Sequence, residues 1–205
     1  MRKLVILGGG TAGTMVANKL RDKYPRSELQ ITVVDRDDHH HYQPGYLFLP
    51  FGQLAPGQIV RARHAFIPDG VELVLCGIER VDAKAKQVFL GNGAVLDYDT
   101  LIIATGVQPR PEATPGGDGP EFGRSVHHFY DLEAAERLQE AMRTFPGGRL
   151  VVHITEMPIK CPVAPLEFLF LADAFFQERG MRERVELIYA TPLPGAFTKP
   201  IASRE

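Results

Sequence analysis

Short apolar runs and a helical repeat alternate at the start of the chain. Residues 3–7 (KLVIL) form an apolar run that three glycines at 8–10 close, which predicts a buried strand ending in a tight turn. From Ala12 onward apolar residues recur every four positions, which predicts a helix that ends before Pro25. Residues 30–34 (QITVV) predict the next strand. A strand, a helix and a strand within about 30 residues are typical of a parallel crossover.

Strand signals crowd the middle of the chain. The stretch 35–68 is expected to be rich in loops, because prolines interrupt it repeatedly. Four short segments then predict successive strands, and the Gly-Asn-Gly turn at 91–93 predicts a hairpin between the last two. The apolar segment 100–104 (TLIIA) predicts a further buried strand, which Thr105 and Gly106 end. The four segments are 71–75, 78–82, 86–90 and 94–97.

The last third of the chain repeats the strand–helix–strand pattern. A helix is predicted over 131–143, where apolar residues follow a helical spacing. A strand over 150–154, a helix from about 166 to 179 and a strand over 185–190 then form a second unit. The tail 192–205 contains no recognisable element. Alternating strands and helices of this kind predict the α/β fold class.

Composition and charge exclude several classes of protein. The chain has 205 residues, with 44% hydrophobic residues and a net charge of −2, which is ordinary for a globular protein and gives no electrostatic sign of nucleic-acid binding. The two cysteines are too far apart for a small disulfide framework or a paired zinc motif. The apolar run at the start is shorter than the roughly 7–15 residues of an export signal, so we expect a cytoplasmic location.

A glycine fingerprint for dinucleotide binding joins the first predicted strand to the first helix. In GxGxxG the first glycine permits the tight turn, the second lets a pyrophosphate approach the backbone, and the third lets helix and strand pack closely. Asp35 follows the third glycine by 22 residues, where a carboxylate can hold a ribose hydroxyl and repel the 2′-phosphate of NADP. We therefore assign to a dinucleotide site the residues Gly8, Gly10, Thr11, Ala12, Gly13, Asp35 and Arg36.

The segment TLIIATG decides between NAD and FAD as the cofactor of this site. An apolar strand that ends in Ala104, Thr105 and Gly106 after a small antiparallel insertion resembles the second signature of flavoproteins with two dinucleotide-binding domains. In such proteins the N-terminal domain holds FAD, and the second domain carries its own glycine fingerprint for NAD(P)H. Here the corresponding loop 155–162 contains no glycine, so we expect that it does not bind a nicotinamide cofactor and that electrons enter from another donor.

Cys161 lies in this glycine-free loop, between Lys160 and Pro162, just before a predicted helix whose first turn contains Pro165. A helix N-terminus and a neighbouring lysine favour the thiolate, so we predict a redox nucleophile rather than an inert buried cysteine. Cys76 has no such surroundings and is interpreted as a packing residue. Because no pair of close cysteines is present, the chain differs from dithiol enzymes such as glutathione reductase and thioredoxin reductase.

Five segments together resemble the sulfide:quinone oxidoreductase and flavocytochrome sulfide dehydrogenase family over essentially the whole chain. The resemblance implies that Cys161 lies next to the flavin and attacks it or carries sulfur. It also implies that sulfide is oxidised to sulfur or polysulfide, with two electrons passing through FAD to a quinone. Tyr42 and Pro44 fall in the family's flavin-proximal loop, which leaves open a contact with the isoalloxazine edge. The segments are MRKLVILGGGTAG, HHYQPGYLFLPFGQ, TLIIATG, MPIKCPVAPLEF and LPGAFTKPIAS.

The same resemblance sets the expected domain organisation. We expect a Rossmann-like FAD-binding domain with an antiparallel β insertion over 1–124, lacking its closing segment. A linker helix and the first β–α–β of a second Rossmann-like domain are expected over 125–205. The resemblance implies a partner cysteine for Cys161 and a membrane-associating part that the family carries in a later stretch, which this sequence does not include. A full-length protein is therefore expected to associate peripherally with the cytoplasmic face of a membrane, and a homo-oligomer is left open.

Two other functions remain open from the sequence. One is a flavoprotein that takes electrons from NADH, as in type II NADH dehydrogenases, against which the glycine-free loop argues. The other is a truncated nucleotide-binding module without catalytic activity. The three histidines 39–41 are interpreted as loop polarity rather than as a metal site, because adjacent histidines rarely converge on one ion. The apolar stretch 166–176 is interpreted as a buried interdomain helix, because a membrane span needs about 20 residues.

Overall fold

The computed structural model describes residues 1–196, which form two compact units. The first unit comprises residues 1–42 and 57–108, and the second comprises residues 43–56 together with the chain from residue 109 onward. These units differ from the predicted domains in two places. The units divide at residue 108 rather than at 124, and the segment 43–56, which we had placed in the first domain, belongs to the second unit. Residues 197–203 of the segment LPGAFTKPIAS lie outside the described residues.

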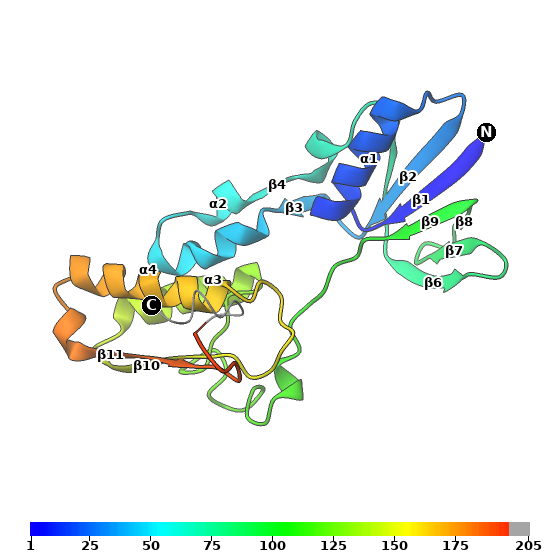
Figure 1. Ribbon diagram of the computed structural model, residues 1–205. Coiled ribbons are helices and arrows are strands. Elements are labelled where there is room, and N and C mark those ends of the chain that lie inside the picture. Colours follow the sequence, from blue (N-terminus) through cyan, green and yellow to red (C-terminus); the bar gives the residue numbers. More distant parts are fainter. Residues whose placement is uncertain (197–205) are drawn as a thin grey trace. The chain divides into compact units, whose positions relative to one another are not determined.

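A four-stranded parallel sheet forms the centre of the first unit (Figure 1). Its strands are β1 (Arg2–Leu7), β2 (Leu29–Asp35), β5 (Glu72–Leu75) and β9 (Thr100–Ile103), in the order β5-β2-β1-β9. The helix α1 (Thr11–Lys23) makes the crossover from β1 to β2. Strand order reverses between β1 and β9, and in open α/β sheets ligands bind at the carboxyl ends of the strands at such a switch point.

Both faces of this sheet are covered, which explains why β1 is a continuous apolar run. Leu4 and Ile6 pack with Ala17 of α1 on one face. Val5 and Leu7 pack on the other face with apolar residues of β7 and its neighbours. That second face is covered by an antiparallel sheet of β6 (Ile78–Asp82), β7 (Gln87–Leu90) and β8 (Val95–Asp97), so the predicted hairpin and antiparallel insertion are confirmed. Cys76 packs at the margin of the same cluster, as predicted.

Two predictions about the first unit were wrong in detail. The segment 100–104 was expected to be a buried strand, but β9 is the last strand of its sheet among the described residues, and the Ile103 side chain is 69% exposed. The three histidines 39–41 were expected in a loop, but they form the short strand β3 (His39–His41), which pairs antiparallel with β4 (Val60–Ala62). The rest of the loop-rich stretch contains the short helices α2 (Pro56–Ile59), η1 (Gln43–Leu47), η2 (Leu49–Phe51) and η3 (Arg63–Phe66).

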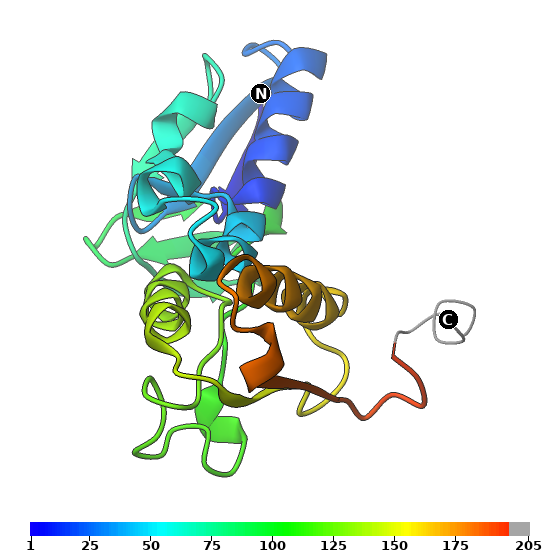
Figure 2. The ribbon, with the colours of Figure 1, turned by 90° about the vertical axis from the view of Figure 1, so that its left-hand side faces the viewer.

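The second unit contains the predicted second strand–helix–strand pattern. β10 (Gly148–His153) and β11 (Val185–Ala190) pair in parallel, and α4 (Ala164–Glu178) connects them. α3 (Leu132–Thr144) lies beside α4, and both helices lie on the same side of the two strands (Figure 2). Their facing apolar residues, with Phe176 fully buried, form the core of this unit. The remaining short helices are η4 (Pro111–Ala113) and η5 (Arg182–Arg184).

The apolar stretch 166–176 belongs to α4 and contributes Phe168, Ala172 and Phe176 to this core. Within residues 1–196, no helix combines the length and the apolar character that crossing a membrane requires.

Candidate functional site

The first and third glycines of the fingerprint are required by close packing at the end of β1. Gly8 adopts a φ of 96°, and a Cβ atom there would lie 2.4 Å from the carbonyl oxygen of Ala104. A Cβ atom on Gly13 would lie 1.8 Å from the carbonyl oxygen of Gly8. Both neighbours are backbone atoms, which cannot move without moving a strand or a helix. The turn from β1 into α1 therefore closes only with glycine at these two positions.

The second glycine of the fingerprint, Gly10, lies in open surroundings rather than in close packing. A Cβ atom on Gly10 would meet no atom of residues 1–196 within 4 Å, and Gly10 is the N-cap of α1 without a side chain that caps the helix. The first N–H groups of a helix have no partner within the helix, and together with the helix dipole they attract an anion. Thr11 and Ala12 begin the helix and are exposed. Open space in front of free N–H groups fits the pyrophosphate of a dinucleotide.

The end of β9 lies beside this turn. The backbone N–H of Ala104 donates a hydrogen bond of 2.7 Å to the carbonyl oxygen of Leu7, the last residue of β1. Thr105 and Gly106 follow and are exposed, and Gly106 adopts a φ of 72°. The structure thus brings the two predicted nucleotide-binding segments together at the switch point between β1 and β9. Their part in binding a cofactor stays a prediction.

Asp35 ends β2 and is held by two contacts on the same oxygen. Its Oδ2 accepts a hydrogen bond from the backbone N–H of Gly9 at 2.7 Å and forms an ion pair with Nη1 of Arg63 at 2.8 Å. Its Oδ1 accepts from the backbone N–H of Arg36 at 2.8 Å. The Arg36 side chain is exposed and pairs with Asp37 at 3.3 Å. Asp35 therefore lies next to the glycine turn, as a ribose-binding carboxylate must.

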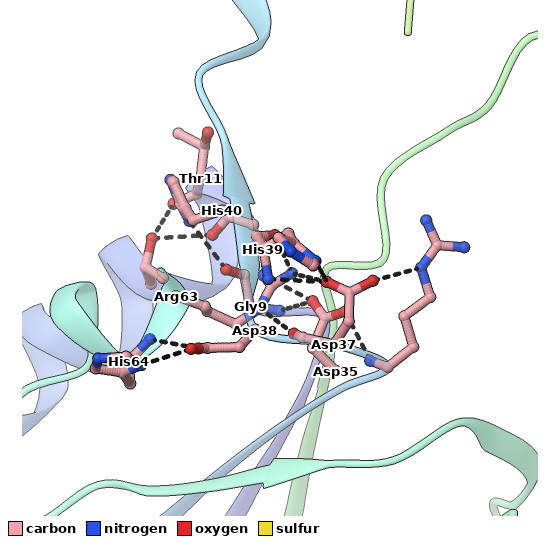
Figure 3. A network of polar contacts seen from close by, with 12 residues as sticks. Gly9, Thr11, Asp35, Asp37, Asp38, His39, His40, Arg63 and His64 are labelled. Carbon is pink, nitrogen blue, oxygen red and sulfur yellow. Dashed lines mark hydrogen bonds and ion pairs between the residues drawn. The ribbon is translucent and has the colours of Figure 1, made fainter. Parts of the chain in front are cut away.

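Arg63 is the buried centre of the polar network in Figure 3. Only 5% of the residue is exposed. Its Nε donates to the carbonyl oxygen of Asp37 at 2.9 Å, and its Nη2 donates to the carbonyl oxygen of His39 at 2.6 Å. Nη2 also lies 3.6 Å from Oδ1 of Asp37, in addition to the ion pair with Asp35. A buried guanidinium is tolerated because carboxylates and carbonyl oxygens replace the water that it loses.

Two further contacts fix the segment that follows β2. The Asp38 carboxylate accepts from the backbone N–H of His64 at 2.9 Å and lies 2.6 Å from its Nδ1. The hydrogen bond from the His64 backbone is the main cause that lowers the pKa of Asp38. Partial burial acts to raise the pKa of Asp37, but the hydrogen bond from His39 and the nearby positive charges outweigh it and lower this pKa. Both carboxylates are thus favoured in the charged form that the network uses.

Arg63 was not among the predicted site residues, because no motif in the sequence points to it. The signal that could have found it is the acidic group of Asp35, Asp37 and Asp38 directly after a buried strand. Three carboxylates so close together need a cation from elsewhere in the fold. Among the described residues, no group of three or more His, Cys, Asp or Glu side chains is placed to hold a metal ion.

A cavity of about 340 Å³ lies elsewhere in the first unit. It is lined by Arg21, Arg26 and Glu72, together with Leu29 at the amino end of β2. Ligands of parallel α/β sheets bind at the carboxyl ends of the strands, so this cavity lies at the wrong end for the dinucleotide. We therefore place the candidate cofactor site at the glycine turn and not in this cavity.

Cys161 lies in the second unit, in the loop between β10 and α4. It is exposed and adopts a φ of 52°, a left-handed conformation that residues other than glycine rarely take. Its carbonyl oxygen accepts a hydrogen bond of 3.1 Å from the backbone N–H of Ala164, the first residue of α4. The thiol is therefore carried by a constrained turn directly ahead of the helix, as its position before Pro165 predicted.

Two buried hydroxyl groups accompany Cys161 in this unit. The hydroxyl oxygens of Tyr130 and Tyr189 are buried and have no hydrogen-bond partner among the described residues. Burial, with added contributions from the charge of Cys161 and from Tyr189, raises the pKa of Tyr130 to about 12. Burial lowers the pKa of Lys160, while the neighbouring charges of Cys161 and Asp131 act in the opposite direction. Cys161 thus has a lysine and a neutral tyrosine in its electrostatic surroundings.

The flavin-proximal loop predicted from the sequence is divided between the two units. Tyr42 belongs to the first unit, is 56% exposed, and donates its backbone N–H to the carbonyl oxygen of Ile59 at 2.8 Å. Pro44 belongs to the second unit and lies in η1. The contact of these residues with a flavin stays a prediction.

The fold and the glycine turn define a dinucleotide-binding α/β protein. The family described as pyridine nucleotide-disulphide oxidoreductase matches residues 2–152, and the chain belongs to this family. The resemblance predicted from the sequence is confirmed at this level, and membership implies FAD as the cofactor.

Several known proteins are similar to most of the chain. Mitochondrial sulfide:quinone oxidoreductase of Mus musculus is 25% identical over 95% of this chain and 43% of its own length. The X-ray structure of sulfide:quinone oxidoreductase from Aquifex aeolicus superposes with a TM-score of 0.78 at 22% identity, over 96% of this chain and 44% of that one. The ferredoxin–NAD(+) reductase component of the p-cumate 2,3-dioxygenase system of Pseudomonas putida is 31% identical over 80% of this chain and 42% of its length. The chain therefore spans less than half the length of these relatives.

Proposed function

We propose that this chain is part of an FAD-dependent oxidoreductase that oxidises sulfide to sulfur or polysulfide and passes the electrons to a quinone. The observation that carries the proposal is Cys161, a single exposed thiol on a constrained turn ahead of α4. The sequence similarity to sulfide:quinone oxidoreductases supports it over nearly the whole chain. The chain spans less than half the length of these relatives, so the activity, the substrate and the electron acceptor are all part of the proposal.

The residues at the glycine turn would hold the cofactor in this enzyme. The N–H groups at the start of α1 would bind the pyrophosphate, and Asp35 would accept a hydrogen bond from the ribose. When bound, FAD supplies the two-electron chemistry that links sulfide to a quinone. The remaining chemistry belongs to Cys161.

Cys161 would take up sulfur as a persulfide. In this step a bond forms between Sγ of Cys161 and the sulfur of sulfide, and two electrons and two protons leave the pair of sulfur atoms. The quinone is the final acceptor of the two electrons, and it takes up two protons to become a quinol. Lys160 places a positive charge near the thiol, which attracts the hydrosulfide anion.

Anaerobic titration of the FAD-loaded protein with sulfide tests the proposal. We expect sulfide to bleach the visible absorbance of oxidised flavin in the wild type and in Cys76→Ala, and not in Cys161→Ala. Cys76→Ala is the matched control, because it removes the other thiol of the chain. If sulfide bleached the Cys161→Ala protein equally, the Cys161 thiol would take no part in the reaction. A protein that binds FAD but does not react with sulfide would refute the sulfide substrate.

NADH is the alternative electron donor, and one observation favours it. Relatives that carry NAD(+) or NADH in their names also match much of the chain, among them the ferredoxin–NAD(+) reductase component from Pseudomonas putida. The loop 155–162 argues against NADH, because it has no glycine to approach a pyrophosphate. Bleaching of the flavin by NADH without sulfide would establish this alternative. A protein that never takes up FAD would instead point to a module without catalytic activity.

A further inference from the structure

We infer that Arg63 is a positioning residue for Asp35, and that it restricts this carboxylate to accepting one hydroxyl of the adenosine ribose. The inference rests on the binding of FAD by the first unit and does not depend on sulfide as the substrate. All the residues that carry it belong to that unit, and Figure 3 shows them together.

The contacts of Asp35 leave one acceptor position free. A carboxylate offers about four acceptor positions, two on each oxygen. Oδ2 accepts a hydrogen bond from Gly9, and its other side is occupied by the ion pair with Nη1 of Arg63 at 2.8 Å, so neither of its positions is open to a ribose hydroxyl. Oδ1 accepts from the backbone N–H of Arg36 and keeps one position. A carboxylate without Arg63 could turn both oxygens toward the two hydroxyls of a ribose, but this one has a single position to offer.

Arg63 can impose this arrangement because its own guanidinium is fixed. Nε and Nη2 are held by the carbonyl oxygens of Asp37 and His39, and the backbone N–H of Arg63 donates to the carbonyl oxygen of Asp38 at 2.8 Å. The guanidinium is a rigid planar fork, so these bonds determine where Nη1 lies. Since Nη1 binds Oδ2 of Asp35, the carboxylate cannot rotate without breaking a buried ion pair.

Gly9 belongs to the same arrangement. A Cβ atom on Gly9 would lie 2.8 Å from Cδ of Arg63 and 3.2 Å from Cγ1 of Val33. The stem of Arg63 therefore lies where any side chain at position 9 would have to go. Glycine at the middle of the first GxG leaves room for Arg63, in addition to donating its N–H to Asp35.

Binding of ADP and of its two deoxy analogues to the FAD-free full chain tests the inference. Isothermal titration calorimetry is carried out with ADP, 2′-deoxy-ADP and 3′-deoxy-ADP on five proteins. The proteins are the wild type, Arg63→Lys, Asp35→Asn, the double variant of these two, and Arg61→Lys. Lysine keeps the charge of Arg63 but cannot make the forked contacts. Arg61→Lys is the matched control, because Arg61 is exposed on β4 only two residues away.

In the wild type we expect one deoxy analogue to bind about as tightly as ADP and the other about tenfold more weakly, because one charged hydrogen bond is lost. The ratio of the two analogues' dissociation constants is therefore the quantity to compare between proteins. Arg61→Lys should keep the wild-type ratio. In Arg63→Lys and in Asp35→Asn the ratio should fall to within about threefold of one, with no further fall in the double variant. A variant that is merely destabilised would instead weaken ADP and both analogues equally.

Several results would overturn the inference. Equal weakening of both analogues in the wild type would mean that Asp35 accepts two hydroxyls, and an unchanged ratio in Arg63→Lys would mean that Arg63 does not position it. If circular dichroism shows that Arg63→Lys does not fold, Gly9→Ala displaces the same side chain from the opposite side and must lower the ratio. A wild type that binds neither ADP nor FAD refutes the cofactor assignment and the inference with it. Failure of the sulfide titration alone leaves the inference standing.

Discussion

Alanine substitutions at the second and third glycines of the fingerprint should affect different properties. Gly13→Ala should destabilise the fold, and Gly10→Ala should weaken FAD binding. A methyl group on Gly13 would lie 1.8 Å from the Gly8 carbonyl oxygen, whereas ordinary contacts begin at 3.4 Å. The start of α1 must therefore move away from β1 by about 1.6 Å, since both partners are backbone. Overpacking costs about 1–3 kcal/mol, and a clash between backbone elements belongs at the upper end of that range. We expect Gly13→Ala to lose about 3 kcal/mol, which lowers the melting temperature by about 6–12 °C.

The same substitution at Gly10 should leave the stability of the FAD-free protein nearly unchanged and should weaken FAD binding. Gly10 has a φ of −75°, which alanine adopts freely, and none of the atoms that the structure describes lies within 4 Å of the added methyl group. We expect Gly10→Ala to change the stability of the FAD-free protein by less than about 1 kcal/mol. The methyl group would occupy the space that the pyrophosphate needs, so FAD affinity should fall about 5- to 150-fold.

Urea unfolding of the FAD-free proteins and the quenching of FAD fluorescence on binding measure the two effects. Hydrogen exchange of the β1 amides assigns the loss in Gly13→Ala to the first unit, because β1 is the strand that α1 must leave. The reasoning would be refuted if Gly10→Ala destabilised the FAD-free protein as much as Gly13→Ala does. It would also be refuted if Gly10→Ala bound FAD as tightly as the wild type.

Three further predictions concern the second unit. The carboxylate of Asp131 caps α3 by accepting from the backbone N–H of Ala134 at 2.8 Å, so Asp131→Ala should cost about 1 kcal/mol in urea unfolding and Asp131→Asn much less. Phe176→Ala empties a fully buried position and should cost about 3–5 kcal/mol by the same measurement. Burial lowers the pKa of His128, so the unfolded chain binds its proton more readily, and stability should fall as the pH drops below the ordinary histidine value of 6.5. Between pH 7.5 and 5.5 the melting temperature should therefore fall less in His128→Gln than in the wild type. His127→Gln is the control and should behave like the wild type. An equal fall in all three proteins would contradict this prediction.

The elements that could be predicted from the sequence are those with a strong local period. β1 lies at the centre of its sheet and is buried on both faces, so its apolar run has no polar interruption from Leu4 to Leu7. α1, α3 and α4 each show an apolar face at helical spacing, and their predicted bounds agree with the structure to within a few residues. The glycine turn could be predicted because its geometry admits only one residue type at two positions.

The features that could not be predicted depend on contacts between distant parts of the chain. TLII is as apolar as a central strand, and only the strand order shows that β9 lies at the edge of the described sheet. β3 and β4 are three residues each, too short for a period, and each is stabilised by pairing with the other. Arg63 lies 28 positions after Asp35, and no spacing rule connects a buried arginine to the carboxylate it neutralises.

The close approach of Arg63 to Gly9 has a consequence for the evolution of this chain. A residue with a side chain at position 9 and an arginine at position 63 would compete for the same space, so the two positions cannot vary independently. Relatives that carry alanine or serine in the middle of the first GxG should have a smaller or differently directed residue at the position of Arg63. In those relatives another cation, or none, would face the carboxylate at the end of β2. Positions 9 and 63 are therefore expected to change together, because the space of one limits the side chain of the other.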